Sequence, residues 1–258
     1  PYDGFKTGRW INFKLSDVTA LKNRIPEIQH IAPRNSSGIF SGSKAQLVNG
    51  QKKGSYNIYG DFPIYTTIST VTIYDGGRFI NESDIKAKRK VCVIGERTQQ
   101  ELFNEGESPI GKFVRINGIH FRIIGVTKFV DGGGFGDDGD IFLPFTTYQR
   151  LYNTGEYVDF LLVAAYPTAD IVQVETNIRA VLKELHHVSP EDKRALGGFN
   201  IGKMFKQITK FASGMSFLSM VIGLATILGG IIGIGNILLI SVKERTKEIG
   251  VRRAIGAT

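Results

Sequence analysis

The 258-residue sequence contains one cysteine, Cys92, and lacks the short motifs that mark common catalytic centres. A single cysteine excludes a disulfide within the chain, and its place in the apolar run Val91–Ile94 predicts a small core residue. Neither a Gly-x-Ser-x-Gly elbow nor a His-Glu-x-x-His zinc motif occurs. These absences favour a chain that is not an enzyme and that carries no cofactor or metal.

Charge is spread along the chain instead of being gathered in one block. The formal net charge is +8, but Lys and Arg are interspersed with Asp and Glu, and neither a recognition helix nor an aromatic-basic patch is evident. Nucleic acid is therefore not an expected partner. No signal-peptide pattern stands at Pro1, and we expect the sequence to be a piece of a longer protein.

Three segments approach known ligand motifs without matching them. Residues 106–113 have the spacing of a phosphate-binding loop, but Phe113 stands where Ser or Thr should bind Mg²⁺, and a hairpin is expected where the motif needs a helix. Residues 131–140 resemble one calcium-binding glycine-rich repeat without a stacked neighbour, so a surface loop is favoured. His186 and His187 lack a third ligand nearby and suit a helix C-terminus.

The longest apolar run, Phe211–Val242, has 32 residues without an ionisable side chain. A helix rises ~1.5 Å per residue, so roughly 20 residues cross a ~30 Å hydrocarbon core. The run predicts a transmembrane helix, bounded at residues 213–242. Five Lys or Arg residues lie near each end of the run, so their number does not decide the orientation. The five downstream residues are more closely spaced, and under the positive-inside rule this favours a cytoplasmic C-terminus.

Small residues recur along this run at Ala225, Gly229 and Gly233, four positions apart and hence on one helical face. Such a stripe lets another helix approach closely in lipid, so we expect it to be a packing face. Before the run, residues 200–212 have apolar positions at helical spacing with lysines opposite. They predict an amphipathic juxtamembrane helix, which lies either on the membrane surface or against the folded domain.

The 210 residues before the apolar run have the pattern of a folded domain. A helix is expected from Ser16, as its N-cap, to a stop near Pro26, followed by strands at 56–59 and 71–74. From Arg89 a buried strand at 91–94 and a helix at 98–103 are expected. Asn117-Gly118 predicts a tight hairpin, because both residues tolerate the positive φ of a type I′ turn. A strand at 141–144 closes this part.

A further strand at 159–166 and an amphipathic helix from Asp170 follow. A strand and a helix on each side of a mostly β excursion predict an α+β layer domain that is split by an insert. The expected parts are a layer domain in residues 1–88 and 156–199, a β insert in 89–155, the juxtamembrane helix, the membrane helix and a charged segment in 243–258.

The segment Ile240–Ala257, which includes Lys-Glu-Arg-Thr-Lys-Glu-Ile-Gly-Val-Arg-Arg-Ala-Ile-Gly, closely resembles the region after the second membrane helix of FtsX/MacB-type ABC transporter permeases. Short upstream motifs are similar to the MacB periplasmic core domain: Gly77-Arg78-Phe79, Val93-Ile94-Gly95, Leu102-Phe103, Pro109-Ile110-Gly111-Lys112 and Phe121–Val126. The resemblance covers most of the chain and is weaker before Tyr65.

This resemblance implies a porter-like periplasmic layer domain, a sabre-like insert and the second of four membrane helices, in the bacterial inner membrane. It implies a permease that transmits ATP-driven motion for efflux of antibiotic-, peptide- or lipid-like substrates. Implied partners are a separate or fused ATP-binding cassette, a second permease as homodimer or paralogous heterodimer, and a periplasmic adaptor. One alternative is an FtsX-like transmitter that regulates a partner such as a cell-wall hydrolase, and the other is a singly anchored receptor or enzyme. The expected ATPase contact comprises Glu244, Arg245, Glu248, Arg252 and Arg253, and the alternative for these charges is a solvated helix with neighbouring ion pairs.

Overall fold

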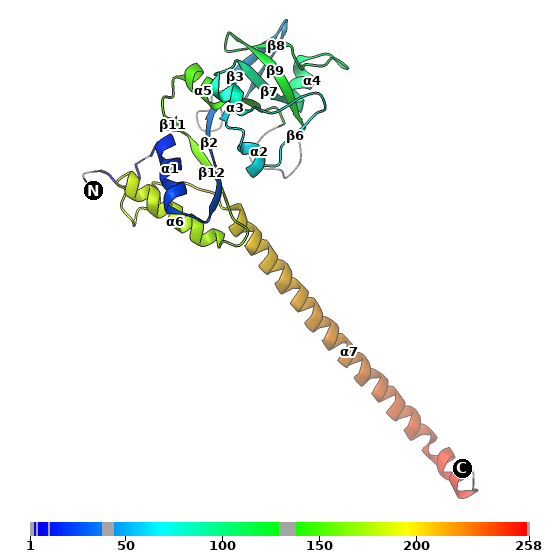
Figure 1. The fold of residues 1–258 in the computed structure, drawn as a ribbon. Helices are drawn as coiled ribbons and strands as arrows, with labels where there is room; N and C mark the ends of the chain where they lie inside the picture. The colour runs from blue at the N-terminus through cyan, green and yellow to red at the C-terminus, as the bar shows by residue number, and fades with distance from the viewer. Residues whose placement is uncertain (1–2, 4, 10, 38–43, 129–137, 257–258) are drawn as a thin grey trace. The chain divides into compact units, whose positions relative to one another are not determined.

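The computed structural model describes residues 3, 5–9, 11–37, 44–128 and 138–256 and has two compact units, residues 1–198 and 199–258 (Figure 1). The first unit combines sheet and helix, and the second is one helix. The expected α+β class with a long apolar C-terminal helix is confirmed. The described part of the 131–140 loop begins at Asp138, so the expected loop lies largely outside the described residues.

The first unit consists of groups of strands separated by single helices. The strands are β1 (Phe13–Lys14), β2 (Ile28–Ser37), β3 (Ala45–Asn49), β4 (Lys52–Tyr56), β5 (Ile58–Asp61), β6 (Thr72–Ile73), β7 (Val91–Gly95), β8 (Phe113–Ile116), β9 (Ile119–Lys128), β10 (Ile141–Pro144), β11 (Tyr157–Val158) and β12 (Phe160–Ala165). The helices are α1 (Leu15–Arg24), α2 (Tyr65–Ile68), α3 (Glu82–Lys86), α4 (Glu96–Leu102), α5 (Phe145–Tyr152) and α6 (Ile171–Leu185), with α7 (Ile201–Ala254) forming the second unit.

One mixed sheet runs through the first unit in the order β12-β2-β5-β10-β7-β9-β8-β3-β4, with β6 on β9. Most neighbours are antiparallel, whereas β5 is parallel to β10 and β7 is parallel to β9. Strands β3, β4 and β5 precede residue 89, yet they share this sheet with β7–β10 of the expected insert. The division at residues 88 and 155 stays a prediction, and the strand pairing adds residues 45–61 to the β-rich side.

Three apolar clusters fill the first unit. One packs α1 and α6 against β2 and β12 around Leu21, Ile31 and Val174. A second fills the β-rich side around Leu47 and Phe121. The third joins them and is rich in aromatic rings, with Tyr59, Phe142 and Phe145 among its buried members. Burial of these side chains, at about 25 cal/mol per Å² of apolar surface, supplies the main stabilisation of the domain.

Two expected turn and cap signals form as the sequence predicts. Asn117 and Gly118 adopt φ angles of 44° and 86° between β8 and β9, which confirms the hairpin. Asp170 caps α6 by accepting a hydrogen bond from the Val172 amide at 3.1 Å. The turn and the cap depend only on residues that are close in sequence, so the local sequence is enough to predict them.

Other expected boundaries are wrong in detail. Helix α1 begins at Leu15 after Lys14 as N-cap, not after Ser16, because the Asp17 carboxylate accepts the Lys14 amide at 2.9 Å. The strand expected at 56–59 is divided at Asn57 into β4 and β5. Helix α4 begins at Glu96, two residues before the expected start.

Candidate functional site

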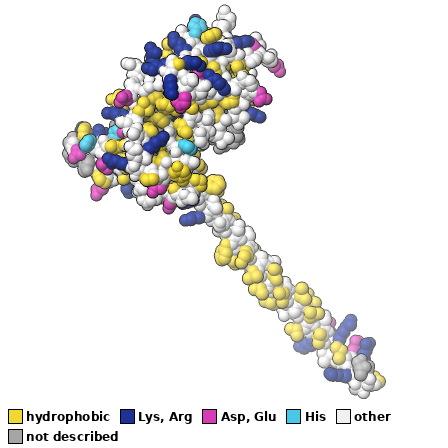
Figure 2. Space-filling model, in the orientation of Figure 1, with side chains coloured by type: hydrophobic (Ala, Val, Ile, Leu, Met, Phe, Trp, Pro, Cys, Tyr) yellow, Lys and Arg dark blue, Asp and Glu magenta, His cyan; other side chains and the backbone are white. Residues whose placement is uncertain are grey.

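The residues expected to act at the membrane all lie on α7, a continuous helix of 54 residues. At ~1.5 Å per residue its length is about 80 Å, well beyond the ~30 Å hydrocarbon core. Its most apolar window has a mean hydropathy of 2.3 and is not buried at all within the chain. Figure 2 shows hydrophobic side chains along this helix and charged ones near its C-terminal end. Helix α7 thus contains the expected membrane segment together with residues 201–212 of the juxtamembrane segment and residues 243–254 of the charged segment.

The small residues Ala225, Gly229 and Gly233 are exposed on α7. A Cβ atom added at Gly229 or Gly233 would meet no atom within 4 Å in the described structure. The face is therefore free to receive another helix, and its backbone could be approached closely because hydrogen replaces a side chain. Its use as a packing face stays a prediction.

The expected ATPase contact occupies the last turns of α7, where Glu244, Arg245, Glu248, Arg252 and Arg253 are all exposed. Glu248 precedes Arg252 by four residues, which is the favourable order for an ion pair on one helical face. Arg252 and Arg253 lie in the last turn, where the helix dipole favours cations. Among residues 201–256 the structure contains no ion pair that occupies these five side chains. Their charges remain available to a partner.

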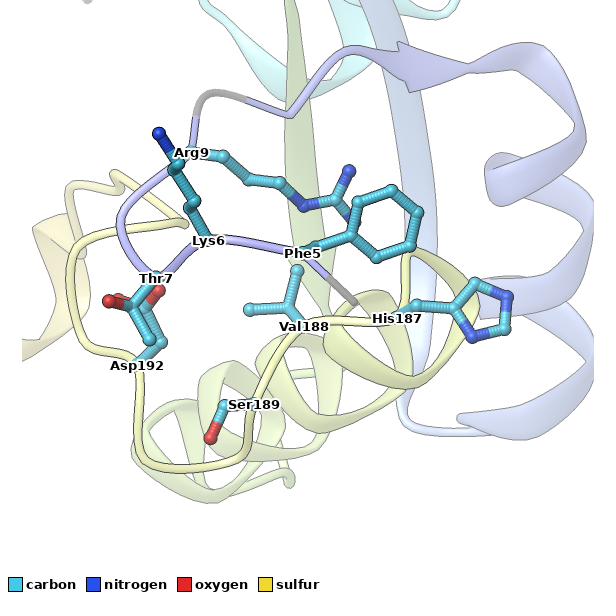
Figure 3. Close-up of a pocket in the computed structure, with 8 residues that line it drawn as sticks. All are labelled: Phe5, Lys6, Thr7, Arg9, His187, Val188, Ser189 and Asp192. Atoms are coloured by element: carbon cyan, nitrogen blue, oxygen red, sulfur yellow. The ribbon is translucent and has the colours of Figure 1, made fainter. Parts of the chain in front are cut away.

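The N-terminal segment of the first unit lies beside the segment that follows α6. The Gly8 amide donates to the Asp192 carboxylate, and the Arg9 guanidinium donates to the His186 carbonyl while it stacks 4.0 Å from the Phe5 ring centroid. Figure 3 shows these two segments side by side. The space between them is about 10 Å³, enough for about one water, so this contact is a clamp between chain segments and not a ligand pocket.

The histidines at the end of α6 lie next to carboxylates. His186 lies 2.7 Å from the Asp17 carboxylate of α1, and His187 lies 3.2 Å from that of Asp3. Within the described residues, no group of three or more His, Cys, Asp or Glu side chains could hold a metal ion. The pair therefore extends the clamp between the start of the domain and the end of α6.

The near-match to a phosphate loop has the wrong surroundings. Residues 106–112 run directly into strand β8, and the Lys112 ammonium pairs with Glu107 at 2.5 Å. A groove of about 360 Å³ lies between this loop and α4, but its carboxylates at Glu96 and Glu107 bind Tyr74 and Lys112. The segment has neither the helix N-terminus nor the free lysine that phosphate binding requires.

A buried ion pair was not expected from the sequence. Arg34 on β2 and Asp61 on β5 are both fully buried, and the Arg34 Cζ atom lies 3.7 Å and 4.2 Å from the ring centroids of Tyr59 and Tyr65. Burial raises the pKa of Asp61 to about 6, although the Arg34 charge opposes this. The one local feature that relates to this pair is Pro33-Arg34 at the end of an apolar run, and that pattern does not specifically predict a buried arginine.

Family models match both units of the chain. Residues 2–181 match the MacB-like periplasmic core domain, and residues 220–258 match the FtsX-like permease C-terminal region. The first match covers well over half of the sequence and establishes the family. Residues 182–219 lie between the two matches.

Curated relatives carry both regions. The chain is 33% identical to the macrolide export ATP-binding/permease protein MacB of Bdellovibrio bacteriovorus over 98% of its own length and 38% of that protein. It is 29% identical to the pyoverdine export ATP-binding/permease protein PvdT of Pseudomonas syringae, over 94% of the chain and 36% of the relative. The chain thus spans less than two fifths of either protein.

Solved structures share the fold of the first unit. The periplasmic region of MacB from Actinobacillus actinomycetemcomitans aligns with a TM-score of 0.63 and 24% identity, covering 81% of this chain and 90% of that one. The extracellular domain of the ABC-type transporter YknZ from Gram-positive bacteria aligns with a TM-score of 0.59 and 17% identity, covering 69% and 87%. With the exposed apolar helix and the family matches, these findings show that the chain belongs to the MacB/FtsX-type ABC transporter permeases, as a MacB-like periplasmic core domain followed by a membrane-spanning helix.

Proposed function

We propose that this chain is part of a permease that transmits ATP-driven motion across the bacterial inner membrane to its periplasmic domain, for efflux of antibiotic-, peptide- or lipid-like substrates. ATP hydrolysis takes place in a cassette outside this chain. The observation that carries the proposal is α7, which joins an exposed apolar stretch and a charged end in one helix. A continuous helix transmits displacement because its backbone hydrogen bonds resist bending between its ends.

The charged end of α7 is the proposed contact with the ATP-binding cassette. Glu244, Glu248 and Arg252 follow each other at four-residue spacing and share one face, with Arg245 and Arg253 one position further round. Mixed charges at this density suit a polar interface, where they fix orientation more than they add affinity. The small-residue face of Ala225, Gly229 and Gly233 is the proposed contact with a neighbouring membrane helix, in a homodimer or a paralogous heterodimer.

The clamp between residues 5–9 and 186–192 supports this role. It fastens the segment that leads into the domain to the segment that leads out of it. If a membrane helix precedes residue 1, as the family resemblance implies, movement of the chain on either side of the domain would be transmitted to it through these two joined segments. A periplasmic adaptor is the remaining proposed partner.

Charge reversal at the end of α7 tests the proposal in the full-length transporter with its ATPase. Arg252→Glu with Arg253→Glu is expected to leave ATP hydrolysis in place and to lower substrate efflux per ATP at least tenfold. The matched control is Lys22→Glu with Arg150→Glu, which makes the same charge change on exposed positions of α1 and α5. Unchanged efflux in the α7 double variant would refute the contact. Coupled movement without any efflux would favour the transmitter alternative.

A further inference from the structure

The outward face of strands β3, β4, β8 and β9 carries cations and an exposed aromatic ring. Along β8, Val114 and Ile116 are buried, whereas Phe113 and Arg115 are exposed, with Phe113 60% exposed. Along β9, Phe121 is buried and its neighbours His120 and Arg122 are exposed. The two-residue period of a strand explains this alternation: one set of side chains enters the core and the other faces solvent.

Strand register places these outward residues in two rows. Lys53 on β4 pairs with Val48 on β3, Val48 pairs with Arg115 on β8, and Arg115 pairs with His120 on β9. In the neighbouring row, Phe113 on β8 pairs with Arg122 on β9. Directly paired residues lie on the same side of a sheet, so the register makes one surface of them. We call Lys53, Phe113, Arg115, His120 and Arg122 the basic sheet face.

No acid offsets these cations within the four strands, since none of the residues of β3, β4, β8 or β9 is Asp or Glu. Lys53, Arg115 and Arg122 are exposed and make no ion pair with any residue that the structure describes. Figure 2 shows Lys and Arg side chains gathered over this part of the first unit. Strands lie ~4.8 Å apart, so Lys53 and Arg115 are about 10 Å apart. That is about one Debye length at physiological salt, so their fields add at the surface.

We propose that the basic sheet face binds an acidic polypeptide surface on another protein. Two arginines beside an exposed phenylalanine match the composition of protein interfaces, in which Arg and aromatic residues are enriched. The guanidinium fork of Arg115 and Arg122 fits carboxylates in a bidentate manner. The face is built on paired strands, so the register fixes the spacing of its side chains. It involves no residue of α7, so this inference is independent of the proposed function.

Binding of a fluorescent decapeptide of glutamate to the full chain in detergent tests the proposal. The wild-type protein is expected to bind it with an affinity that falls steeply with salt, and a lysine decapeptide is expected not to bind. Arg115→Glu with Arg122→Glu is expected to weaken binding at least tenfold. Both side chains are exposed, and Arg115→Gln with Arg122→Gln repeats the test without introducing repulsion.

The double charge reversal Lys22→Glu and Arg150→Glu is the control, because it changes net charge equally at exposed positions outside the face. It should keep binding within twofold. Equal losses in the control and in the face variant would show that net charge alone attracts the peptide, which overturns the proposal. Absence of wild-type binding overturns it too. Binding of phosphatidylglycerol vesicles that depends on Arg115 and Arg122, without peptide binding, would assign the face to lipid instead.

Discussion

Arg34 and Asp61 form an ion pair in which both side chains are fully buried, with 2.8 Å between the Arg34 Nε atom and an Asp61 carboxylate oxygen. The pair joins β2 to β5, and β2 also pairs with β12. It therefore lies where the helix-covered strands meet the β-rich side of the sheet. The rings of Tyr59 and Tyr65 cover the guanidinium, whose two terminal nitrogens have no hydrogen-bond partner in the described structure. Cation–π contact takes the place of those hydrogen bonds.

Arg34→Met is expected to lower the free energy of unfolding by about 3–5 kcal/mol, because it leaves the Asp61 charge buried without a partner. Urea unfolding of the detergent-solubilised chain, followed by near-ultraviolet circular dichroism, measures it. Arg24→Met is the control, since Arg24 pairs with Glu184 on the surface and both side chains are largely exposed. Its effect should be below about 1 kcal/mol. Similar effects of the two substitutions would contradict the importance of the buried pair.

Stability should depend on pH through Asp61. Burial raises its pKa to about 6, whereas the ordinary value is 3.8. An acid that holds its proton more tightly in the fold contributes stability that is complete below the unfolded pKa and is lost as pH rises through the folded pKa. The free energy of unfolding of the wild type, relative to Asp61→Asn, should therefore fall by about 3 kcal/mol between about pH 4 and pH 7.

Urea titrations of the two proteins at several pH values provide this difference. Asp75→Asn, on an exposed turn, serves as the control and should run parallel to the wild type. A wild-type curve that stays parallel to Asp61→Asn throughout this range would show that burial does not perturb Asp61.

Gly125→Ala should destabilise the β-rich side of the domain. A Cβ atom at Gly125 would collide with the Arg78 backbone carbonyl, which cannot move without breaking the hydrogen bond from the Arg78 amide to Ile124. We expect a loss of about 1–3 kcal/mol, the usual cost of overpacking. Gly197→Ala is the matched control, because a Cβ atom there meets nothing within 4 Å. Thermal unfolding of both variants measures the difference, and an unchanged melting temperature for Gly125→Ala would contradict the close approach.

Gly233→Leu should weaken association of neighbouring membrane helices. Leucine adds a bulky side chain to the face shared with Ala225 and Gly229, where close packing depends on small residues. Cysteine crosslinking between permease subunits in native membranes should fall severalfold. Gly235→Leu is the control, because two helical positions turn its side chain about 200° away from Gly233. Wild-type crosslinking yields in Gly233→Leu would count against the packing face.

The sequence alone determined the features that depend on neighbouring residues. The 32-residue run without an ionisable side chain predicted the apolar helix, because length and hydropathy suffice for that conclusion. Asn117-Gly118 predicted its hairpin, and Asp170 predicted the start of α6. The motifs after Val242 predicted an ATPase contact at the end of α7 through their resemblance to the family. No contact within the described part of the chain tests that role.

Tertiary structure decided what depends on residues that are distant in sequence. Nothing local indicated that β5 would lie parallel to β10, or that β3 and β4 would extend the sheet beyond β8. Arg34 and Asp61 are unremarkable charges until strand pairing brings them together away from water. The basic sheet face also arises only from register, because Lys53 and Arg115 are scattered in a chain whose charges are mixed. Local patterns report backbone preference and burial, whereas the pairing of distant strands decides which side chains share a surface.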